Sequence, residues 1–253
     1  MSGESREKAL PGTLYGIGVG PGDPELLTMK AHRILGDVPV LAVPTSYADA
    51  GSMALEVLRP LLAEREKGRR SPDIVSLLFP MTRDETILAE ARKKNAEVLL
   101  GALSRGDVAF VALGDILFYS TFGNLLSGLF PLAPHLRVEV VPGITAYGAG
   151  VAKLVEPLTQ GSERLAVLPA VYAPEEIEQA LDLFEVVVLM KINKVFPAIR
   201  EILARRGLLD RTAYISSVGM AGERIERRLD RVAPEEVPYM SLLVVRKNGW
   251  MAR

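Results

Sequence analysis

The chain has 253 residues, a length that fits one or two domains. Hydrophobic residues make up 49% and charged residues 24%, the balance of an ordinary folded protein, which excludes disorder as the dominant state. The 30 basic and 31 acidic side chains leave a net charge of -1, which argues against a general electrostatic grip on nucleic acid. No apolar run approaches the roughly 18 residues that a membrane-spanning helix needs. We therefore expect neither nucleic acid nor a membrane as a partner.

Cysteine is absent, so disulfides, thiolate metal sites and cysteine nucleophiles are excluded. The two histidines, His32 and His135, lie far apart in the sequence. They give little support to a histidine metal site or a Ser-His-Asp triad, and we expect no bound metal. The first ten residues are charged and contain no apolar core, unlike a signal peptide, and predict a cytoplasmic location.

Short apolar runs alternate with helical patterns in the first part of the chain. The runs are apolar on both faces, as buried parallel strands are, and the alternation is typical of an α/β fold. Strands are predicted at Thr13–Val19, Val38–Val43, Ile74–Phe79, Asp107–Leu113 and Arg137–Val141, and helices at Asp23–Leu35 and Glu85–Ser104. The charged segment Arg65–Pro72, with its glycine and proline, predicts an exposed loop.

The pattern breaks at Val155–Arg164, which we interpret as the passage between two domains, residues 1–155 and 156–253. Beyond it the alternation of strands and helices resumes. Strands are predicted at Leu165–Leu168, Val186–Met190, Ala213–Ser217 and Tyr239–Val245, and helices near Pro174–Leu183 and Val195–Arg206.

A glycine-rich loop, GIGVGPGDPELLT at Gly16–Thr28, follows the first predicted strand. Glycines allow a ligand or a neighbouring backbone to come close, and the helix predicted after the loop would offer unpaired N–H groups. The spacing is G-x-G-x-G, not the G-x-G-x-x-G of dinucleotide-binding folds, and no Lys-Ser/Thr pair follows Gly22. A tight turn with a packing role only remains the alternative.

Four further segments stand at the ends of predicted strands, rich in glycine or polar residues. In open α/β sheets, ligands bind beyond the carboxyl ends of the strands. Each segment alone could be structural, but together they indicate one ligand site that both halves of the chain assemble. The four segments are Leu113–Phe122, Val140–Gly150, Met190–Lys191 and Ser216–Ile225.

Taken in order, the five segments resemble the tetrapyrrole methylase family, which uses S-adenosylmethionine (SAM) to methylate modified tetrapyrroles. Gly18–Thr28 matches its G-x-G-P-G-D-x-x-L-[LI]-T motif, and the resemblance spans about residues 13 to 246. Three segments, Phe79–Glu85, Gly114–Phe122 and Met220–Ile225, are similar to the members that methylate C-20 of precorrin-2 or cobalt-factor II in cobalamin biosynthesis. The resemblance implies two α/β domains, a parallel N-terminal and a mixed C-terminal sheet, with the cofactor in the cleft between them, and a homodimer.

The resemblance also implies which residues bind SAM, with S-adenosylhomocysteine (SAH) as product. The predicted cofactor-binding residues are Pro21, Leu113, Gly114, Asp115, Phe118, Ser120, Thr121, Thr145, Ala146, Met190, Gly219 and Met220. Ile116 stands where the family has proline in a Gly-Asp-Pro turn. Ala42 and Val43 stand near the place where uroporphyrinogen methylases have an aspartate base, which leaves no evident general base.

Methyl transfer from a sulfonium is an in-line displacement, and an electron-rich tetrapyrrole carbon can attack when it is held correctly. Tyr119 is the candidate catalytic residue, for moving the product proton or binding a ring substituent; capping of the following helix is the alternative for residues 119–121. Arg83 and Arg224 are preferred for binding substrate carboxylates, against the alternative of a solvated surface. The other basic candidates are Lys30, Arg33, Lys153, Lys191 and Lys194.

Several functions remain open. The nearest alternative is a tetrapyrrole methylase that acts at a different carbon, followed by a sibling family that methylates a modified residue on a protein. A non-catalytic SAM-binding module is the alternative from another class, and glycine spacing disfavours an NAD-dependent oxidoreductase. The motifs do not distinguish a metal-free from a cobalt-bound substrate.

Overall fold

The computed structural model describes residues 10–46, 51–68, 71–169, 174–233, 235 and 237–251. The chain divides into two compact units, Met1–Ile144 (unit 1) and Thr145–Arg253 (unit 2). Unit 2 begins with helix α5 (Ala146–Leu154), which packs against strand β9 (Arg224–Glu226) of the same unit. The predicted boundary after residue 155 therefore falls within unit 2 and not at its start.

Unit 1 contains a five-stranded parallel sheet, as the sequence predicts, and its strand order is β3-β2-β4-β1-β5. The three central strands are almost wholly buried. Edge strands β3 and β5 are not, and Ile74 on β3 is 49% exposed, so the expectation of burial on both faces is wrong for them. The strands are β1 (Leu14–Gly18), β2 (Val40–Thr45), β3 (Asp73–Leu78), β4 (Val108–Ala112) and β5 (Val138–Val141).

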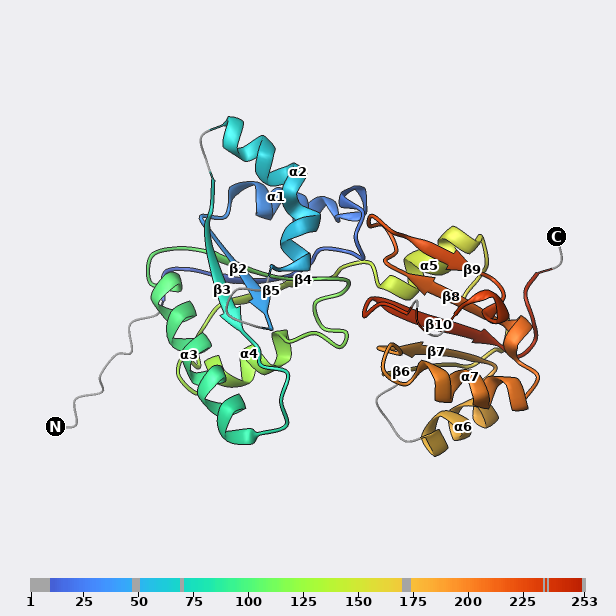
Figure 1. Ribbon diagram of the computed structural model, residues 1–253. Helices are drawn as coiled ribbons and strands as arrows, with labels where there is room; N and C mark the ends of the chain where they lie inside the picture. Colours follow the sequence, from blue (N-terminus) through green and yellow to red (C-terminus); the bar gives the residue numbers. More distant parts are fainter. Residues whose placement is uncertain are drawn as a thin grey trace. The chain divides into compact units, whose positions relative to one another are not determined.

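Helices cover both faces of this sheet, with α1 and α2 on one face and α3 and α4 on the other (Figure 1). The apolar sides of α3 and α4 pack on β1, β2 and β4, where the Phe110 and Phe122 rings stack at 5.6 Å. The helices are η1 (Pro24–Leu26), α1 (Met29–Asp37), α2 (Met53–Lys67), α3 (Glu85–Leu103) and α4 (Phe122–Leu129).

The helix predicted at Asp23–Leu35 is in fact divided. Asp23 caps only the single turn η1, and its Oδ1 accepts a hydrogen bond from the Glu25 N–H at 2.9 Å. Leu27 and Thr28 are extended, and α1 begins at Met29, where the Thr28 hydroxyl accepts from the Ala31 N–H. The glycine loop therefore leads into one 3₁₀ turn and not directly into an α-helix.

The loop predicted at Arg65–Pro72 is also partly wrong, because Arg65 lies in α2, a helix that the sequence analysis missed. The interior Pro60 weakens the helical pattern there. The Arg65 guanidinium donates to the carbonyl oxygens of Leu35 (2.7 Å) and Val38 (3.1 Å), and so holds α2 against the end of α1. Residues 69 and 70 of the predicted loop lie outside the described residues.

Unit 2 contains a mixed sheet in the order β6-β7-β10-β8-β9. Strands β6 and β7 are parallel, and β10 runs antiparallel to its neighbours β7 and β8. Helices α6 and α7 cover one face and α5 the other (Figure 1). The new elements are β6 (Leu165–Pro169), α6 (Pro174–Leu183), β7 (Val186–Met190), α7 (Phe196–Arg205), η2 (Leu209–Arg211), β8 (Thr212–Ser216), η3 (Leu229–Arg231) and β10 (Ser241–Arg246).

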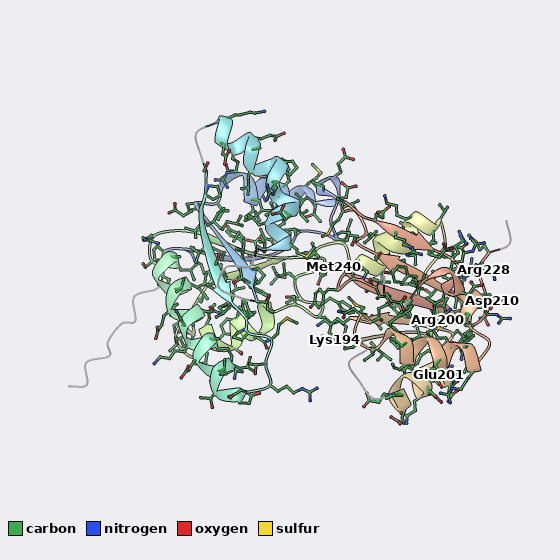
Figure 2. All side chains as sticks on the ribbon, in the orientation of Figure 1. Lys194, Arg200, Glu201, Asp210, Arg228 and Met240 are labelled. Atoms are coloured by element: carbon green, nitrogen blue, oxygen red, sulfur yellow. The ribbon has the colours of Figure 1, made fainter. Side chains whose placement is uncertain are left out.

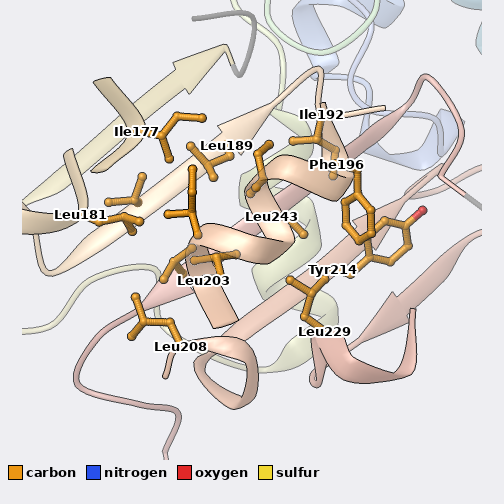
Figure 3. Packing of buried hydrophobic residues seen from close by; sticks show 14 of the residues in the cluster. Ile177, Leu181, Leu189, Ile192, Phe196, Leu203, Leu208, Tyr214, Leu229 and Leu243 are labelled. Carbon is orange, nitrogen blue, oxygen red and sulfur yellow. The ribbon is translucent and has the colours of Figure 1, made fainter. Parts of the chain in front are cut away.

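The core of unit 2 lies between the sheet and helices α6 and α7 (Figure 3). Phe196 of α7 and Tyr214 of β8 meet edge to face at 6.2 Å. The buried Tyr214 hydroxyl lies 3.0 Å from the Ser241 hydroxyl, so its polar end has a partner inside the core.

Buried charges connect the segment after α5 with the end of the chain. The fully buried Glu156 carboxylate accepts from the Arg227 guanidinium at 2.8 Å and from the Met251 N–H at 3.1 Å. Arg246, only 2% exposed, donates to Glu163 at 2.9 Å and to the Pro157 carbonyl oxygen at 3.0 Å. The segment 155–164 is thus fastened to unit 2 by this buried-charge cluster.

None of the helices in the described part of the chain has the length and apolar character that crossing a membrane requires.

Candidate functional site

The glycine-rich ends of β1 and β4 are joined directly in unit 1. Gly20 and Gly114 exchange two backbone hydrogen bonds, of 3.1 and 2.7 Å. The turn after β5 packs on the same place, because a Cβ added to Gly143 would lie 2.2 Å from the Gly114 carbonyl oxygen. A Cβ on Gly18 would meet the Gly143 nitrogen at 2.7 Å. Three motifs that are separate in the sequence therefore form one structure, which we call the glycine edge (residues 18–22, 113–115 and 142–143).

Asp115 fastens the glycine edge. Its Oδ1 accepts from the Leu117 N–H at 2.9 Å, and its Oδ2 accepts from the Gly143 N–H at 2.9 Å. Each carboxylate oxygen thus holds a backbone donor, one in its own turn and one in the turn after β5. Asp115 therefore has a positioning role, and its direct contact with SAM stays a prediction.

The glycine edge leaves room beside Gly114. This residue has a φ of +74°, and no atom of the described residues lies within 4 Å of the place where its Cβ would be. Leu113, Gly114 and Asp115 are half-buried, whereas Pro21 is buried. A small molecule could therefore approach the backbone of residues 113–115, which fits a bound cofactor.

The segment after Asp115 contains both capping and strained residues. The Ser120 hydroxyl donates to the Ile116 carbonyl oxygen and accepts from the Phe122 N–H at 3.0 Å, so Ser120 caps α4. Thr121, although it is the N-cap, makes no side-chain capping bond. Tyr119 has a φ of +51° and its ring is edge-on to that of Phe118 at 4.7 Å. Left-handed backbone costs a non-glycine residue about 1–3 kcal/mol and is concentrated at functional sites.

Ile116, which replaces the family proline, is completely buried among the apolar side chains of unit 1. The shape of the turn does not need the proline ring, because the Asp115 hydrogen bonds and the Gly20–Gly114 pair already hold it. Isoleucine at this position lacks the rigid ring of proline, but its side chain packs in the apolar core of unit 1.

In unit 2, two predicted segments lie at one end of the sheet. Met190 ends β7, Ser216 ends β8, and both pair with the start of β10. The Ser217 N–H donates to the Met240 carbonyl oxygen at 2.9 Å, so the turn that carries Gly219 and Met220 starts beside Met240. Met240 and Lys194 are labelled at this end of unit 2 in Figure 2, and Asp210 and Arg228 at the opposite end.

The remaining predicted cofactor residues lie at the start of α5. Thr145 is its N-cap, and its hydroxyl accepts from the Gly148 N–H at 3.3 Å; Ala146 is the first helical residue. The structure therefore places the predicted site residues in two groups. Unit 1 carries Pro21, Leu113, Gly114, Asp115, Phe118, Tyr119, Ser120 and Thr121, and unit 2 carries Thr145, Ala146, Met190, Gly219 and Met220.

Several of the basic candidates have partners within the chain. Lys30 pairs with Glu139 at 2.6 Å, and Lys153 pairs with Glu223 at 3.3 Å. Arg224 donates to the Arg231 carbonyl oxygen at 3.0 Å and lies over the Tyr214 ring at 5.9 Å, so part of its guanidinium is already committed. Arg83, Arg33 and Lys194 are exposed.

The sequence analysis missed the acidic partners. Glu223 lies within the Met220–Ile225 segment that is similar to C-20 methyltransferases. It pairs with Lys153 and accepts a hydrogen bond from the Gly219 N–H, but the positions of these residues in the sequence do not predict either contact.

A large shift of a carboxyl pKa belongs to a structural pair. Hydrogen bonds from the Arg164 guanidinium and backbone N–H lower the pKa of Glu185 to about 2. Glu185 immediately precedes β7, at the end of that strand opposite Met190. In the described part of the chain, no cluster of three or more His, Asp or Glu side chains could hold a metal ion.

Known proteins match this chain over nearly its full length. The family model of the tetrapyrrole (corrin/porphyrin) methylases matches residues 13–232. A cobalt-precorrin-2 C(20)-methyltransferase of Salmonella typhimurium is 33% identical, over 94% of this chain and 97% of the relative. A precorrin-2 C(20)-methyltransferase of a Sinorhizobium species is 34% identical, over 96% and 97%.

A solved structure agrees with these sequence matches. The uroporphyrin-III C-methyltransferase of Thermus thermophilus, complexed with S-adenosylhomocysteine, is 26% identical with a TM-score of 0.65, and covers 93% of this chain and 98% of its own. The two α/β units, with a parallel and a mixed sheet, are thus a known fold, and the expectation of fold class is confirmed. The sequence motifs, the two sheets and these matches show that the chain belongs to the tetrapyrrole methylase family.

Proposed function

We propose that this chain is a SAM-dependent methyltransferase that adds a methyl group to C-20 of precorrin-2 or its cobalt-bound counterpart in cobalamin biosynthesis. The observation that carries the proposal is the 33–34% identity, over nearly the whole chain, to two relatives named for C-20 methylation. The SAH in the Thermus structure supports the choice of cofactor.

The two groups of predicted residues would together hold the cofactor. The glycine edge supplies a rigid surface, since a Cβ on Gly18 or on Gly143 would collide with the backbone of the neighbouring segments. Unit 2 supplies the start of α5, Met190 and the turn with Gly219 and Met220. We propose that each of these groups contributes cofactor-binding residues.

Bound SAM supplies an activated methyl group on a sulfonium. When C-20 attacks that methyl carbon, the carbon–sulfur bond breaks, SAH leaves and C-20 loses its proton. The residues of this chain align the two reactants, because rigid placement at roughly 3–3.5 Å supplies much of the rate. Arg83 and Arg224 would bind substrate carboxylates. Tyr119 would relay the C-20 proton to water through its hydroxyl, accepting one proton as it gives up its own, or bind a ring substituent.

The decisive experiment is an anaerobic reaction of the full chain with SAM and either precorrin-2 or cobalt-factor II, read by mass spectrometry. Uroporphyrinogen III is the control substrate. We expect one added methyl group with an equal amount of SAH, and the preferred substrate defines the metal state. Methylation of uroporphyrinogen III alone would contradict the C-20 assignment, and SAM binding without any transfer would favour a non-catalytic module.

Tyr119→Phe tests the catalytic assignment, with Tyr15→Phe on β1 as a matched control. We expect Tyr119→Phe to lower kcat by about 100-fold, the lower end of the usual contribution from proton transfer, and to leave SAM affinity unchanged. Turnover equal to that of the control variant would remove Tyr119 from the mechanism.

The homodimer and the cytoplasmic location belong to the same proposal. Exposed Ile74 and Leu78 on edge strand β3 offer an apolar surface that a second copy could cover. Light scattering of the purified chain and fractionation of cells that produce it test the two statements.

A further inference from the structure

The turn after β8 has an unusual backbone. Ser217, Gly219 and Gly222 have φ values of +48°, +76° and +85°. Two successive backbone hydrogen bonds, from Met220 N–H to Ser217 O (2.9 Å) and from Glu223 N–H to Met220 O (3.1 Å), close it. A left-handed serine is unfavourable and persists only where its surroundings hold it. The 217–223 turn therefore needs a fastening.

Glu223 supplies that fastening. Its Oε2 accepts from the Gly219 N–H at 2.7 Å, and its Oε1 lies 3.3 Å from the Lys153 Nζ. A hydrogen bond to a carboxylate is roughly twice as strong as one between neutral groups. The Glu223 side chain is only 28% exposed, which limits competition from water. One carboxylate thus connects the 217–223 turn to the last turn of α5.

A second connection lies farther along the same segment. The Arg227 guanidinium donates to the Leu154 carbonyl oxygen and to the buried Glu156 carboxylate. Arg227 follows β9, so α5 is held at two places, by Glu223 of the turn and by Arg227 in the chain that follows it. The start of α5 and Gly219 of the turn, both in the predicted cofactor-binding set, therefore belong to one fastened body.

We propose that Glu223 is a positioning residue for cofactor binding. It holds Gly219 and Met220 in their binding conformation through the Gly219 N–H, and Lys153 orients its carboxylate. This inference rests on the proposed function, since it takes SAM to be the ligand of the turn. No contact between Glu223 and the ligand is required.

Glu185 offers a matched control. It too accepts a backbone N–H (Arg164, 2.9 Å) and pairs with a cation, and its side chain is 27% exposed. It differs in lying at the other end of the unit 2 sheet. If Glu223→Ala weakened SAH binding only because the protein became less stable, Glu185→Ala should weaken it as well. An effect that is specific to the 217–223 turn should be absent from Glu185→Ala.

The test is calorimetric titration of SAH into the full-length wild type and four variants, with hydrogen exchange of the Gly219 amide in the free proteins. We expect Glu223→Ala to raise the Kd about tenfold, the loss of one charged hydrogen bond, and to speed Gly219 exchange. Glu223→Gln retains an acceptor and should stay within about threefold of wild type, as should Lys153→Met. Glu185→Ala should leave the Kd unchanged.

An unchanged Kd in Glu223→Ala would overturn the inference on Glu223, as would an equal weakening of SAH binding in Glu223→Gln or Glu185→Ala. In either case, binding of SAH by the wild type would leave the proposed function standing. A wild type that binds no SAH would overturn both. The two failures are therefore distinguishable in one experiment.

Discussion

The ends of the two units that carry the predicted ligand-binding residues are held by different means. In unit 1 the glycine edge is backbone against backbone, with Gly18, Gly114 and Gly143 in close approach. In unit 2 the corresponding end is held by side chains, through Glu223 and Lys153. The shape of this end therefore depends on close backbone packing, fastened by the Asp115 carboxylate, in unit 1 and on a charged side-chain pair in unit 2.

The same contrast extends through each unit. Among the described residues, unit 2 contains the buried-charge cluster around Glu156 and Arg246. The lowered carboxyl pKa values are also concentrated there. They belong to Glu163, Asp182, Glu185 and Asp230 in unit 2, and to Glu56 in unit 1. Substitutions of glycine should therefore damage unit 1, and losses of charge should damage unit 2.

Removal of the buried cation should have the largest effect. Arg246→Met leaves Glu163 and Glu156 without one of their cationic partners in a buried setting, which typically costs about 3–5 kcal/mol of the free energy of unfolding. Urea unfolding followed by circular dichroism measures it. Arg164→Met, which removes an exposed ion pair, is the control and should shift the midpoint far less. Equal shifts in the two variants would contradict the contrast.

Gly143→Ala should be next. The added methyl group would lie 2.2 Å from the Gly114 carbonyl oxygen. The methyl carbon is bonded directly to the backbone and the oxygen is a backbone atom, so the clash can be relieved only by a shift of the main chain. We expect a loss of about 3 kcal/mol in the same assay. In Gly101→Ala, on α3, the new methyl meets nothing within 4 Å and should stabilise the chain by up to about 1 kcal/mol.

Asp115→Asn should have an intermediate effect. An amide group replaces one acceptor oxygen, so one of the two bonds, to Leu117 or to Gly143, is lost at about 1.5 kcal/mol. Asp107→Asn is a matched control, since Asp107 holds the Thr13 N–H at the opposite end of β4. Both should lower stability, but only Asp115→Asn should weaken SAM binding in calorimetry. Equal SAM affinities would confine Asp115 to a structural role.

The smallest effect is the pH dependence of unit 2. The folded pKa of Glu185, about 2, lies below its ordinary value of 4.5 because Arg164 binds the ionised form. Its contribution to stability is therefore complete above about pH 4.5 and lost as the pH falls toward 2. The fluorescence of Trp250, the one tryptophan, reports on unit 2. The midpoint of thermal unfolding, followed by this fluorescence, should fall as the pH is lowered from about 4.5 toward 2, and it should fall less steeply in Glu185→Gln. Parallel curves of midpoint against pH for the wild type and this variant would refute the assignment.

Much of the fold could be predicted from the sequence, because buried strands are short apolar runs. Helix α6 and strand β7 have the predicted bounds, and the parallel sheet of unit 1 follows from the alternation of strands and helices. Helix α2 was missed because Pro60 interrupts its pattern. The break between η1 and α1 was missed because the sequence contains two residues that can begin a helix, Asp23 and Thr28, and each caps its own helix.

The site was predictable as a set of segments but not as a set of contacts. Glycine spacing identifies Gly114 and Gly143, yet only the folded backbone brings them within van der Waals contact. Charged partners are harder still. Lys153 and Glu223 are seventy positions apart, and nothing local to either residue predicts their pairing.

Ile116 has a consequence for recognising related chains. Its side chain is wholly enclosed, and the turn around it is set by Asp115 and by paired glycines. Any apolar residue of suitable volume should serve there. A search pattern that demands proline after Gly-Asp would pass over this chain, whereas one written as Gly-Asp followed by an apolar residue would retrieve it.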